Sequence, residues 1–395
     1  PLDSSTTWQG TYTLNSGSNT LNITAMDSKG YQSAPVAITV ILDDKAPVIS
    51  GSTPPNNSFV NTVISSVTIN LSDTYSTIDL TATTTGATVK NSSSQEIPGA
   101  WATGPNAVIF TPSNSLSQDT YTVTIHPTDA FGNKATSQIT FTYDATAPPS
   151  PTVNTVSSPT NQSSQTLTGT KSTDTVAITV TSSTATIGTV TYPASTTWSV
   201  PVTGLKTGDN VITVTAKDAA SNTTSPVTAT IVYDITPPAA PVVNAFTSPT
   251  KESTITLTGT KEVNSSILIG GVVKVALDTL DTWQSTYTLQ SGSNTVSITS
   301  KDAAGNQSSA ATLTIIRDNA APVIESSVPV NNSNTAKVVS SVTINLTDTY
   351  SAVDLTGSTT GATVRNAAGL AVPGVWTTSG TKTVVFTPSN PFPED

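Results

Sequence analysis

The chain has no cysteine, one histidine and one methionine in 395 residues, and only 10% of its residues are charged. Without thiols no disulfide can form, so each domain must depend on its apolar core. The one histidine, His126, has no second histidine or thiol to work with. There is then no plausible catalytic triad and no zinc-type ligand spacing, and we predict that the protein is not an enzyme.

Positive charge is also scarce, and the formal net charge is −10. No basic stripe is present to neutralise phosphates, which argues against nucleic acid as a partner. No apolar stretch approaches the roughly twenty residues that a transmembrane helix needs. The sequence therefore predicts no membrane span in this segment.

Serine and threonine are abundant and make up about a third of the residues. Glycine and proline fall between short runs rich in Val, Ile and Thr, a composition typical of β-strands with regular turns. In Val211–Ala216, for example, Ile212, Val214 and Ala216 share one face and threonines the other. No window carries a helical period of useful length, and we predict an all-β chain.

The sequence repeats itself at two intervals. TWQGTYTLNSGSNTLNIT around Trp8 returns as TWQSTYTLQSGSNTVSIT around Trp283, 275 residues later. SPTNQSSQTLTGTK, ending at Lys171, returns 90 residues later as SPTKESTITLTGTK, ending at Lys261. These offsets define two unit types, X and Y, arranged in a three-domain cassette X, X, Y.

The repeats predict five segments. They are a partial X unit (1–43), a Y unit (44–144), two X units (145–234 and 235–318) and a partial Y unit (319–395) that lacks its last two strands. Pro1 aligns with Ala276 and Asp395 with Asp119, so we expect a longer parent protein. A whole unit has room for about seven strands, the size of an immunoglobulin-like sandwich.

The turn phrase L-x-x-G-x-N-x-(V/I)-x-(V/I)-x-(A/S)-x-D-x-x-G-N is read from Leu289 to Asn306, and partly from Leu205 onward. With the D-x-(T/A)-(A/P)-P junctions at Asp144, Asp234 and Asp318, it resembles the bacterial immunoglobulin-like repeat domains of large surface adhesins. The resemblance implies an extended tandem array of seven-stranded immunoglobulin-like β-sandwiches, outside the cell or on its surface. The turn itself varies between copies.

Several aromatic residues fit this fold. Tyr121, where the Y unit departs from the phrase, resembles the tyrosine corner at the start of strand F. The tryptophans recur at a fixed place in each unit type, which favours core packing over sugar-stacking platforms. They are Trp8, Trp101, Trp198, Trp283 and Trp376.

Aspartates gather where one unit passes to the next. In a seven-stranded sandwich the entering linker lies beside the B–C and F–G loops, so carboxylates from all three should converge there. Calcium takes six to eight oxygen ligands in flexible geometry and would offset their repulsion. We therefore predict interdomain calcium sites from four groups: Asp43, Asp44, Asp73 and Asp129; Asp144 and Asp218; Asp234 and Asp302; Asp318 and Asp348.

A plainer alternative explains the same residues by turn chemistry. An Asp at the start of such a turn accepts hydrogen bonds from backbone N–H groups that follow it, while glycine takes a positive φ. This alternative applies to Asp27, Asp129, Asp218 and Asp302, and the strand-end aspartates would then be solvated caps. The first group, with four carboxylates, is the better candidate for calcium.

Two functions remain in contention. The first is a repetitive spacer or stalk of a bacterial surface adhesin, whose partners are neighbouring domains of the same chain. The second is a self-associating subunit of a filament, sheath or surface layer, because the outer faces carry few lysines to prevent lateral pairing. A carbohydrate-binding module is a third, which would need an exposed aromatic pair. The sequence identifies no glycan or host ligand.

Overall fold

A computed structural model describes residues 7–392; the first six residues of the predicted segment 1–43 and the last three of segment 319–395 lie outside it. Contacts divide the chain into two compact units, which are described separately. The first runs to Val156 and adds residues 164–205 and 210–230; the second holds residues 157–163, 206–209 and 231 onward. Strands dominate both, as the sequence predicted.

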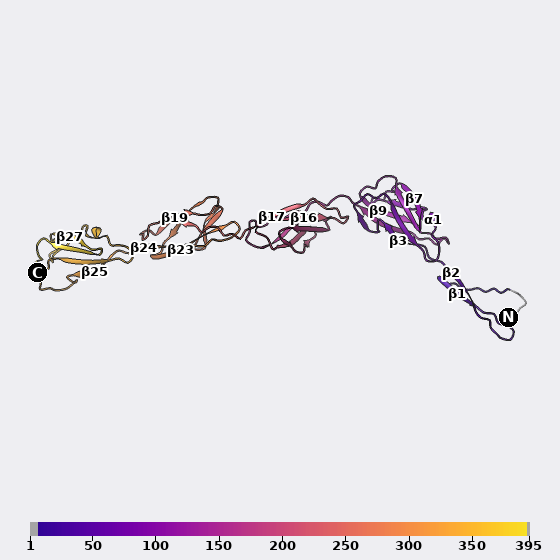
Figure 1. Ribbon diagram of the computed structural model, residues 1–395, viewed down its shortest axis with the longest axis horizontal. Coiled ribbons are helices and arrows are strands. Elements are labelled where there is room, and N and C mark those ends of the chain that lie inside the picture. Colours follow the sequence, from indigo (N-terminus) through magenta and orange to yellow (C-terminus); the bar gives the residue numbers. More distant parts are fainter. Residues whose placement is uncertain (1–6, 393–395) are drawn as a thin grey trace. The chain divides into compact units, whose positions relative to one another are not determined.

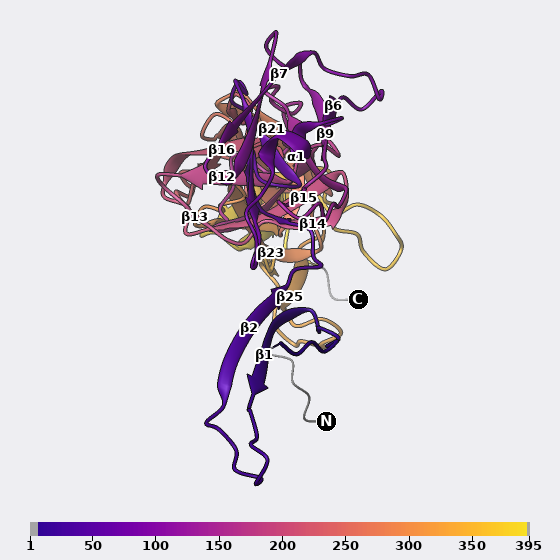
Figure 2. The same ribbon diagram turned by 90° about the vertical axis from the view of Figure 1, so that its right-hand side faces the viewer.

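The first unit begins with a two-stranded antiparallel ribbon, β1 (Gly17–Ile23) and β2 (Val36–Leu42), seen in Figure 2. In this ribbon Ile38 and Val40 are exposed, although the pattern predicts a buried face. Trp8 is 72% exposed, so the predicted core packing is wrong for this tryptophan. Its counterpart Trp283 is buried in a cluster with Leu257, Ile267 and Ile269, which precede it by 14 to 26 residues, and segment 1–43 has no equivalent of these three residues.

The predicted Y unit is a sandwich of two four-stranded sheets (Figure 1). One sheet has the order β3 (Val48–Thr53), β5 (Val67–Ser72), β8 (Ala107–Pro112), β7 (Gly99–Gly104). The other has the order β4 (Ser58–Val60), β10 (Ser137–Tyr143), β9 (Asp119–Ile125), β6 (Thr88–Lys90). The unit has eight strands rather than seven, because the short strand β4 pairs in parallel with β10.

Alternating residues of both sheets form the core of this sandwich. Val67, Ile69 and Leu71 of β5 are buried, as are Tyr121 and Val123 of β9. The Tyr121 hydroxyl donates a 2.7 Å hydrogen bond to the backbone oxygen of Ser117, four residues upstream. The predicted tyrosine corner is confirmed.

Two short helices, which no sequence period indicated, occupy equivalent places in the two Y units. They are α1 (Leu80–Thr84) and α2 (Leu355–Thr359). Asp79 and Asp354 cap them by accepting from the backbone nitrogens of Ala82 and Gly357. Five residues are too few to establish a helical period, and only the cap could have indicated them.

Residues 145–234 contain seven strands. They are β11 (Ser164–Thr170), β12 (Ala177–Ser182), β13 (Thr186–Ile187), β14 (Thr191–Ala194), β15 (Thr197–Thr203), β16 (Gly208–Lys217) and β17 (Val227–Tyr233). One sheet has the order β11-β15-β13, with β14 also paired to β15, and the other β12-β16-β17. Trp198, Val200 and Val202 of β15 are buried on one face, and the predicted alternation of β16 is confirmed.

In the second unit, residues 235–318 also form seven strands. They are β18 (Val242–Val243), β19 (Thr254–Thr260), β20 (Ser265–Ile269), β21 (Val272–Asp278), β22 (Thr282–Thr288), β23 (Gly292–Asp302) and β24 (Ala311–Arg317). The two sheets have the orders β18-β19-β22 and β21-β20-β23-β24. Trp283 and Ile298 lie in the core between them.

The remaining residues form a single sheet of order β25 (Val323–Val328), β26 (Val342–Thr347), β28 (Thr383–Pro388), β27 (Gly374–Ser379). This matches the order β3-β5-β8-β7 of the complete Y unit. Trp376 packs against Phe386 at 5.2 Å, as Trp101 packs against Phe110. No described helix is long and apolar enough to cross a membrane.

Candidate metal centre

Three of the predicted aspartates meet at the start of the Y unit. Asp43 follows β2, Asp73 follows β5, and Asp129 lies in the loop between β9 and β10. One carboxylate oxygen from each lies within 4.8 Å of the other two. The group brings together residues 30 to 86 positions apart in the chain, as the fold resemblance led us to expect.

Asp44 lies outside this group. Its Oδ1 accepts a 2.5 Å hydrogen bond from the hydroxyl of Ser16 and lies 3.6 Å from the ammonium of Lys45. The hydrogen bond from Ser16 lowers the pKa of Asp44, so this carboxylate is ionised but satisfied elsewhere. The first predicted group is therefore narrowed from four residues to three.

The three carboxylates differ in how far backbone donors satisfy them. Asp73 Oδ1 accepts from the backbone nitrogens of Tyr75 and Ser76 at 2.9 and 3.0 Å. Asp43 Oδ1 accepts from that of Lys45 at 3.2 Å, whereas Asp43 Oδ2 is buried with no hydrogen-bond partner among the described residues. Burying a carboxylate oxygen without a partner costs free energy unless a hydrogen-bond donor or a cation interacts with it.

Asp129 is the most buried member, with 2% of its surface exposed. Burial alone would raise its pKa, but hydrogen bonds from the side chain and backbone of Asn133 and the backbone of Phe131 lower it below the ordinary value of 3.8. Asp129 is therefore ionised near neutrality. A small cavity of about 140 Å³ lined by Asp43, Asp73 and Tyr75 adjoins the group. Oxygen ligands of this kind fit a hard cation such as calcium.

The second and third junctions are built differently, because no third carboxylate joins either predicted pair among the described residues. Asp144 and Asp234 each accept from the backbone nitrogen two residues on, at 3.0 and 2.9 Å. Asp218 and Asp302 each accept from the backbone and side-chain nitrogens of the asparagine four residues on. The turn chemistry expected of these aspartates is present, and calcium at these pairs stays a prediction.

Sequence reasoning missed the asparagine that links each turn to the linker. The side-chain nitrogens of Asn133, Asn222 and Asn306 donate to the backbone oxygens of Asp43, Asp144 and Asp234 at 3.1, 2.8 and 2.9 Å. The recurrence of Asn four residues after Asp was visible in the sequence. The partner was not, since it lies 72 to 90 residues away.

At the last junction Asp348 occupies the place of Asp73. Hydrogen bonds from the backbone nitrogens of Ser351 and Tyr350 lower its pKa, and the side chain of Asp318 interacts with it as well. Asp318 also accepts from the backbone nitrogen of Ala320 at 3.2 Å. The predicted pair is thus close together, and the position equivalent to Asp129 is not among the described residues.

Tyrosines beside two of these acids contact the preceding repeat. A Cβ built on Gly17 would lie 3.0 Å from the Tyr75 hydroxyl, and one built on Gly292 would lie 2.9 Å from that of Tyr350. Both glycines have positive φ and begin a strand. The absence of a side chain at these glycines makes room for the tyrosine of the next repeat.

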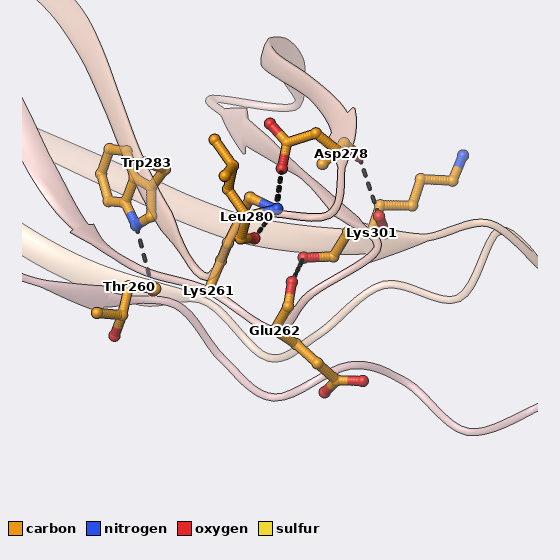
Figure 3. Close-up of polar contacts among 9 residues, drawn as sticks. Thr260, Lys261, Glu262, Asp278, Leu280, Trp283 and Lys301 are labelled. Carbon is orange, nitrogen blue, oxygen red and sulfur yellow. Dashed lines mark hydrogen bonds and ion pairs between the residues drawn. The ribbon is translucent and has the colours of Figure 1, made fainter.

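An ion pair between a buried lysine and a partly exposed aspartate lies away from the junctions. The ammonium of Lys261 has no exposed side-chain surface and donates to Asp278 Oδ1 at 2.8 Å and to the backbone oxygen of Leu280 at 2.7 Å (Figure 3). The hydrogen bond from Lys261 lowers the pKa of Asp278. The pair ties the end of β19 to the end of β21, and we assign it a structural role.

Two family models match the chain. Residues 43–145 match the model described as bacterial Ig-like domain, and residues 281–367 match bacterial Ig-like domain (group 3). The chain thus contains bacterial immunoglobulin-like domains in tandem, as its sequence resemblance implied. Such domains are typically structural rather than enzymatic, and they are consistent with a surface protein.

Solved structures from several organisms match parts of the chain. PcoC, a methionine-rich copper resistance protein from Escherichia coli, is 21% identical, and the match covers 25% of this chain and 99% of PcoC with a TM-score of 0.23. The human desmocollin-1 ectodomain is 15% identical over 94% of this chain and 79% of its own, with a TM-score of 0.24. Fibronectin(III)-like modules of Clostridium thermocellum CbhA are 12% identical over 47% and 93%, with a TM-score of 0.29.

At such low identities and TM-scores, what those proteins bind says nothing about this chain. No curated protein matches it.

Proposed function

We propose that this chain is a repetitive extracellular spacer segment of a large bacterial adhesin-like surface protein, and that it projects a binding region away from the cell. Closed sandwich domains in series suit this role, because each repeat needs contact only with its neighbours. The domains serve as non-enzymatic structural elements.

The observation that carries this proposal is the linker contact that recurs at three junctions. A spacer works best when each domain keeps a restricted orientation relative to the next. Domains joined by small polar interfaces move relative to each other by default. Here the asparagine contacts of Asn133, Asn222 and Asn306 tie each linker to the domain that it enters. The same bond at three places indicates that linker direction matters to function.

The experiment is to lengthen the chain by one cassette. A variant that carries residues 44–318 twice should remain a monomer, and its maximum dimension in small-angle X-ray scattering should increase by the same increment when a third copy is added. The thermal midpoints should not change. A maximum dimension that stays constant as copies are added would rule out a spacer.

A second function is favoured by one observation. In the whole X unit 235–318, the edge strand β21 carries two exposed apolar side chains, Val272 and Val273. Exposed apolar strands are sites of lateral association. A self-associating subunit of a filament or surface layer would assemble with rising concentration, which sedimentation velocity distinguishes from a monomeric spacer.

We also propose that Asp43, Asp73 and Asp129 bind calcium and stiffen the first junction. One carboxylate oxygen of each aspartate lies within 4.8 Å of the other two, and Asp43 Oδ2 is buried with no hydrogen-bond partner among the described residues. Asp43 Oδ2 would coordinate the calcium ion, and the positive charge of the ion would offset the repulsion among the three carboxylates.

Each of the five predicted segments contains one tryptophan, which allows this site to be tested by itself. In a variant where Trp101 is the sole tryptophan, millimolar calcium should raise the unfolding midpoint by about 4 °C, whereas a Trp198-only variant should not respond. Asp43→Asn should abolish the rise. Asp44→Asn is the matched control, because Asp44 pairs with Ser16 instead. An equal midpoint with and without calcium would exclude the site.

A further inference from the structure

We propose that Asn133, Asn222 and Asn306 are positioning residues which fix the linker as it enters each domain without any need for a metal ion. The inference deepens the proposed spacer function, on which it rests. We call the contact the amide clasp: the asparagine side chain between the turn aspartate and the linker carbonyl.

The geometry of the clasp is the same three times. The asparagine backbone nitrogen donates to Oδ1 of the aspartate four residues earlier, at 2.8 Å in each copy. The side-chain nitrogen donates to Oδ2 of that aspartate at 2.7, 2.9 and 2.9 Å. It also donates to the linker carbonyl at 3.1, 2.8 and 2.9 Å. Both N–H bonds of the amide are used, so the side chain is held in one orientation.

Each clasped carbonyl lies at a defined point of the chain. Asp43 directly follows β2, Asp144 follows β10, and Asp234 follows β17. The clasp therefore holds the first residue after the last strand of one repeat against a loop of the next. Because the strand fixes the residue before the carbonyl and the clasp fixes the carbonyl itself, little freedom remains at that peptide.

A direct contact across the third junction involves the same loop. The backbone nitrogen of Asn161, in the preceding repeat, donates to the backbone oxygen of Ala304 at 3.0 Å. Its side chain also lies close to Gly305, where a Cβ would approach the Asn161 amide to 3.3 Å. Ala304 and Gly305 lie between Asp302 and Asn306, so the clasped turn also touches the domain that comes before it.

One loop of the chain has the same aspartate turn but lacks the asparagine. At Asp27–Tyr31 a tyrosine stands where the other loops have asparagine, and Asp27 Oδ1 still accepts from the backbone nitrogens of Lys29 and Tyr31 at 2.9 Å each. The turn therefore forms without the amide. Loss of the asparagine should loosen the linker and leave the domain folded.

The absence of cysteine makes a distance measurement straightforward. In the full chain, Thr103→Cys and Thr181→Cys place spin labels on exposed strand residues on either side of the second junction. Double electron–electron resonance should give one narrow distribution of the distance between the two spin labels. Asn222→Asp, which is nearly isosteric but places a carboxylate against the Asp144 carbonyl and the Asp218 carboxylate, should broaden it about twofold. Asn222→Tyr, which copies the loop at Tyr31, should do the same.

Asn91→Asp is the matched control. It introduces the same Asn-to-Asp charge away from the junction: the Asn91 side-chain oxygen accepts from the backbone nitrogen of Gln95 at 2.8 Å, within its own loop. The distribution should stay as narrow as in the unmodified chain. Amide exchange of β16 should remain unchanged in all variants.

Three results would overturn the proposal: a broad distribution in the unmodified chain, a narrow one in both Asn222 variants, or rapid exchange of β16 in those variants, which would make Asn222 a core residue. Failure of the spacer function would be seen separately, as concentration-dependent assembly of the unmodified chain.

Discussion

The two whole X units, residues 145–234 and 235–318, share the sequence TGTK but use its lysine differently. Lys261 is fully buried and paired with Asp278. Lys171 donates to the backbone oxygens of Ser172 and Thr175 and lies 5.5 Å from the ring centroid of Tyr192. The same side chain at the same strand end is thus satisfied by an ion pair in one copy and by carbonyls and an aromatic ring in the other.

The glycine of the same motif does not vary in this way. A Cβ on Gly169 would lie 1.9 Å from the backbone oxygen of Thr152, and one on Gly259 would lie 1.8 Å from that of Val242. Trp198 and Trp283 stand beside these glycines and are buried in both copies. Both X units thus keep the glycine that lets a backbone oxygen approach closely and the buried tryptophan beside it. The polar partners of the lysine at the strand end differ between the two units.

The largest expected effect is a substitution at these glycines. Gly169→Ala and Gly259→Ala should each destabilise their own unit by roughly 3 kcal/mol, because the added Cβ would overlap a backbone carbonyl rather than a flexible side chain. Single-tryptophan variants with Trp198 or Trp283 report the two units separately. Gly51→Ala is the control, since its Cβ would find only Asn70 at 3.9 Å and should cost almost nothing. Each loss is taken relative to the same unit without the substitution, with Trp101 as the reporter for Gly51. Equal losses in all three units would refute the comparison.

The next effect separates the two lysines. Lys261→Met removes the hydrogen bonds of a buried ammonium to Asp278 and to the backbone oxygen of Leu280, and should lower the midpoint of the Trp283 transition by about 10 °C. Lys171→Met should lower that of Trp198 by less than about 5 °C, because carbonyl groups lose only a hydrogen bond. The double variant Lys261→Met, Asp278→Leu should recover most of the loss. A larger loss at Lys171 than at Lys261 would reverse our interpretation.

The smallest expected effect concerns the pH dependence of the stability of the Y unit. The folded pKa of Asp129 is lowered from 3.8, so its contribution is fully present above pH 3.8 and is lost as the pH falls through the folded pKa. Denaturant unfolding followed by Trp101 should show decreasing stability as the pH is lowered from about 5 to 3. Asp129→Asn should flatten this dependence. An unchanged slope would show that Asp129 is not responsible.

Much of the fold followed from local sequence patterns. The alternation in Val211–Ala216 predicted the faces of β16, and Tyr121 was identified at the tyrosine corner. Features of three to five residues, such as β4 and α1, were missed because they are shorter than any period.

The candidate site was predicted only in part, because some of its contacts involve atoms that no sequence pattern marks. The convergence of Asp43, Asp73 and Asp129 followed from the order of loops in the sandwich. The partners of Asp44 and Asn133 are a serine of the preceding repeat and a backbone oxygen, and neither carries a signature of its own. A side-chain contact across 28 residues and a side-chain-to-backbone contact across 90 residues appear only when the chain is folded.

The most direct test of the central claim is sedimentation velocity of the full chain over a hundredfold range of concentration. The spacer account predicts one species with the mass of a monomer, 40.4 kDa, and a high frictional ratio that does not change with concentration. A sedimentation coefficient that rises with concentration, or a frictional ratio typical of a compact globule, would contradict it.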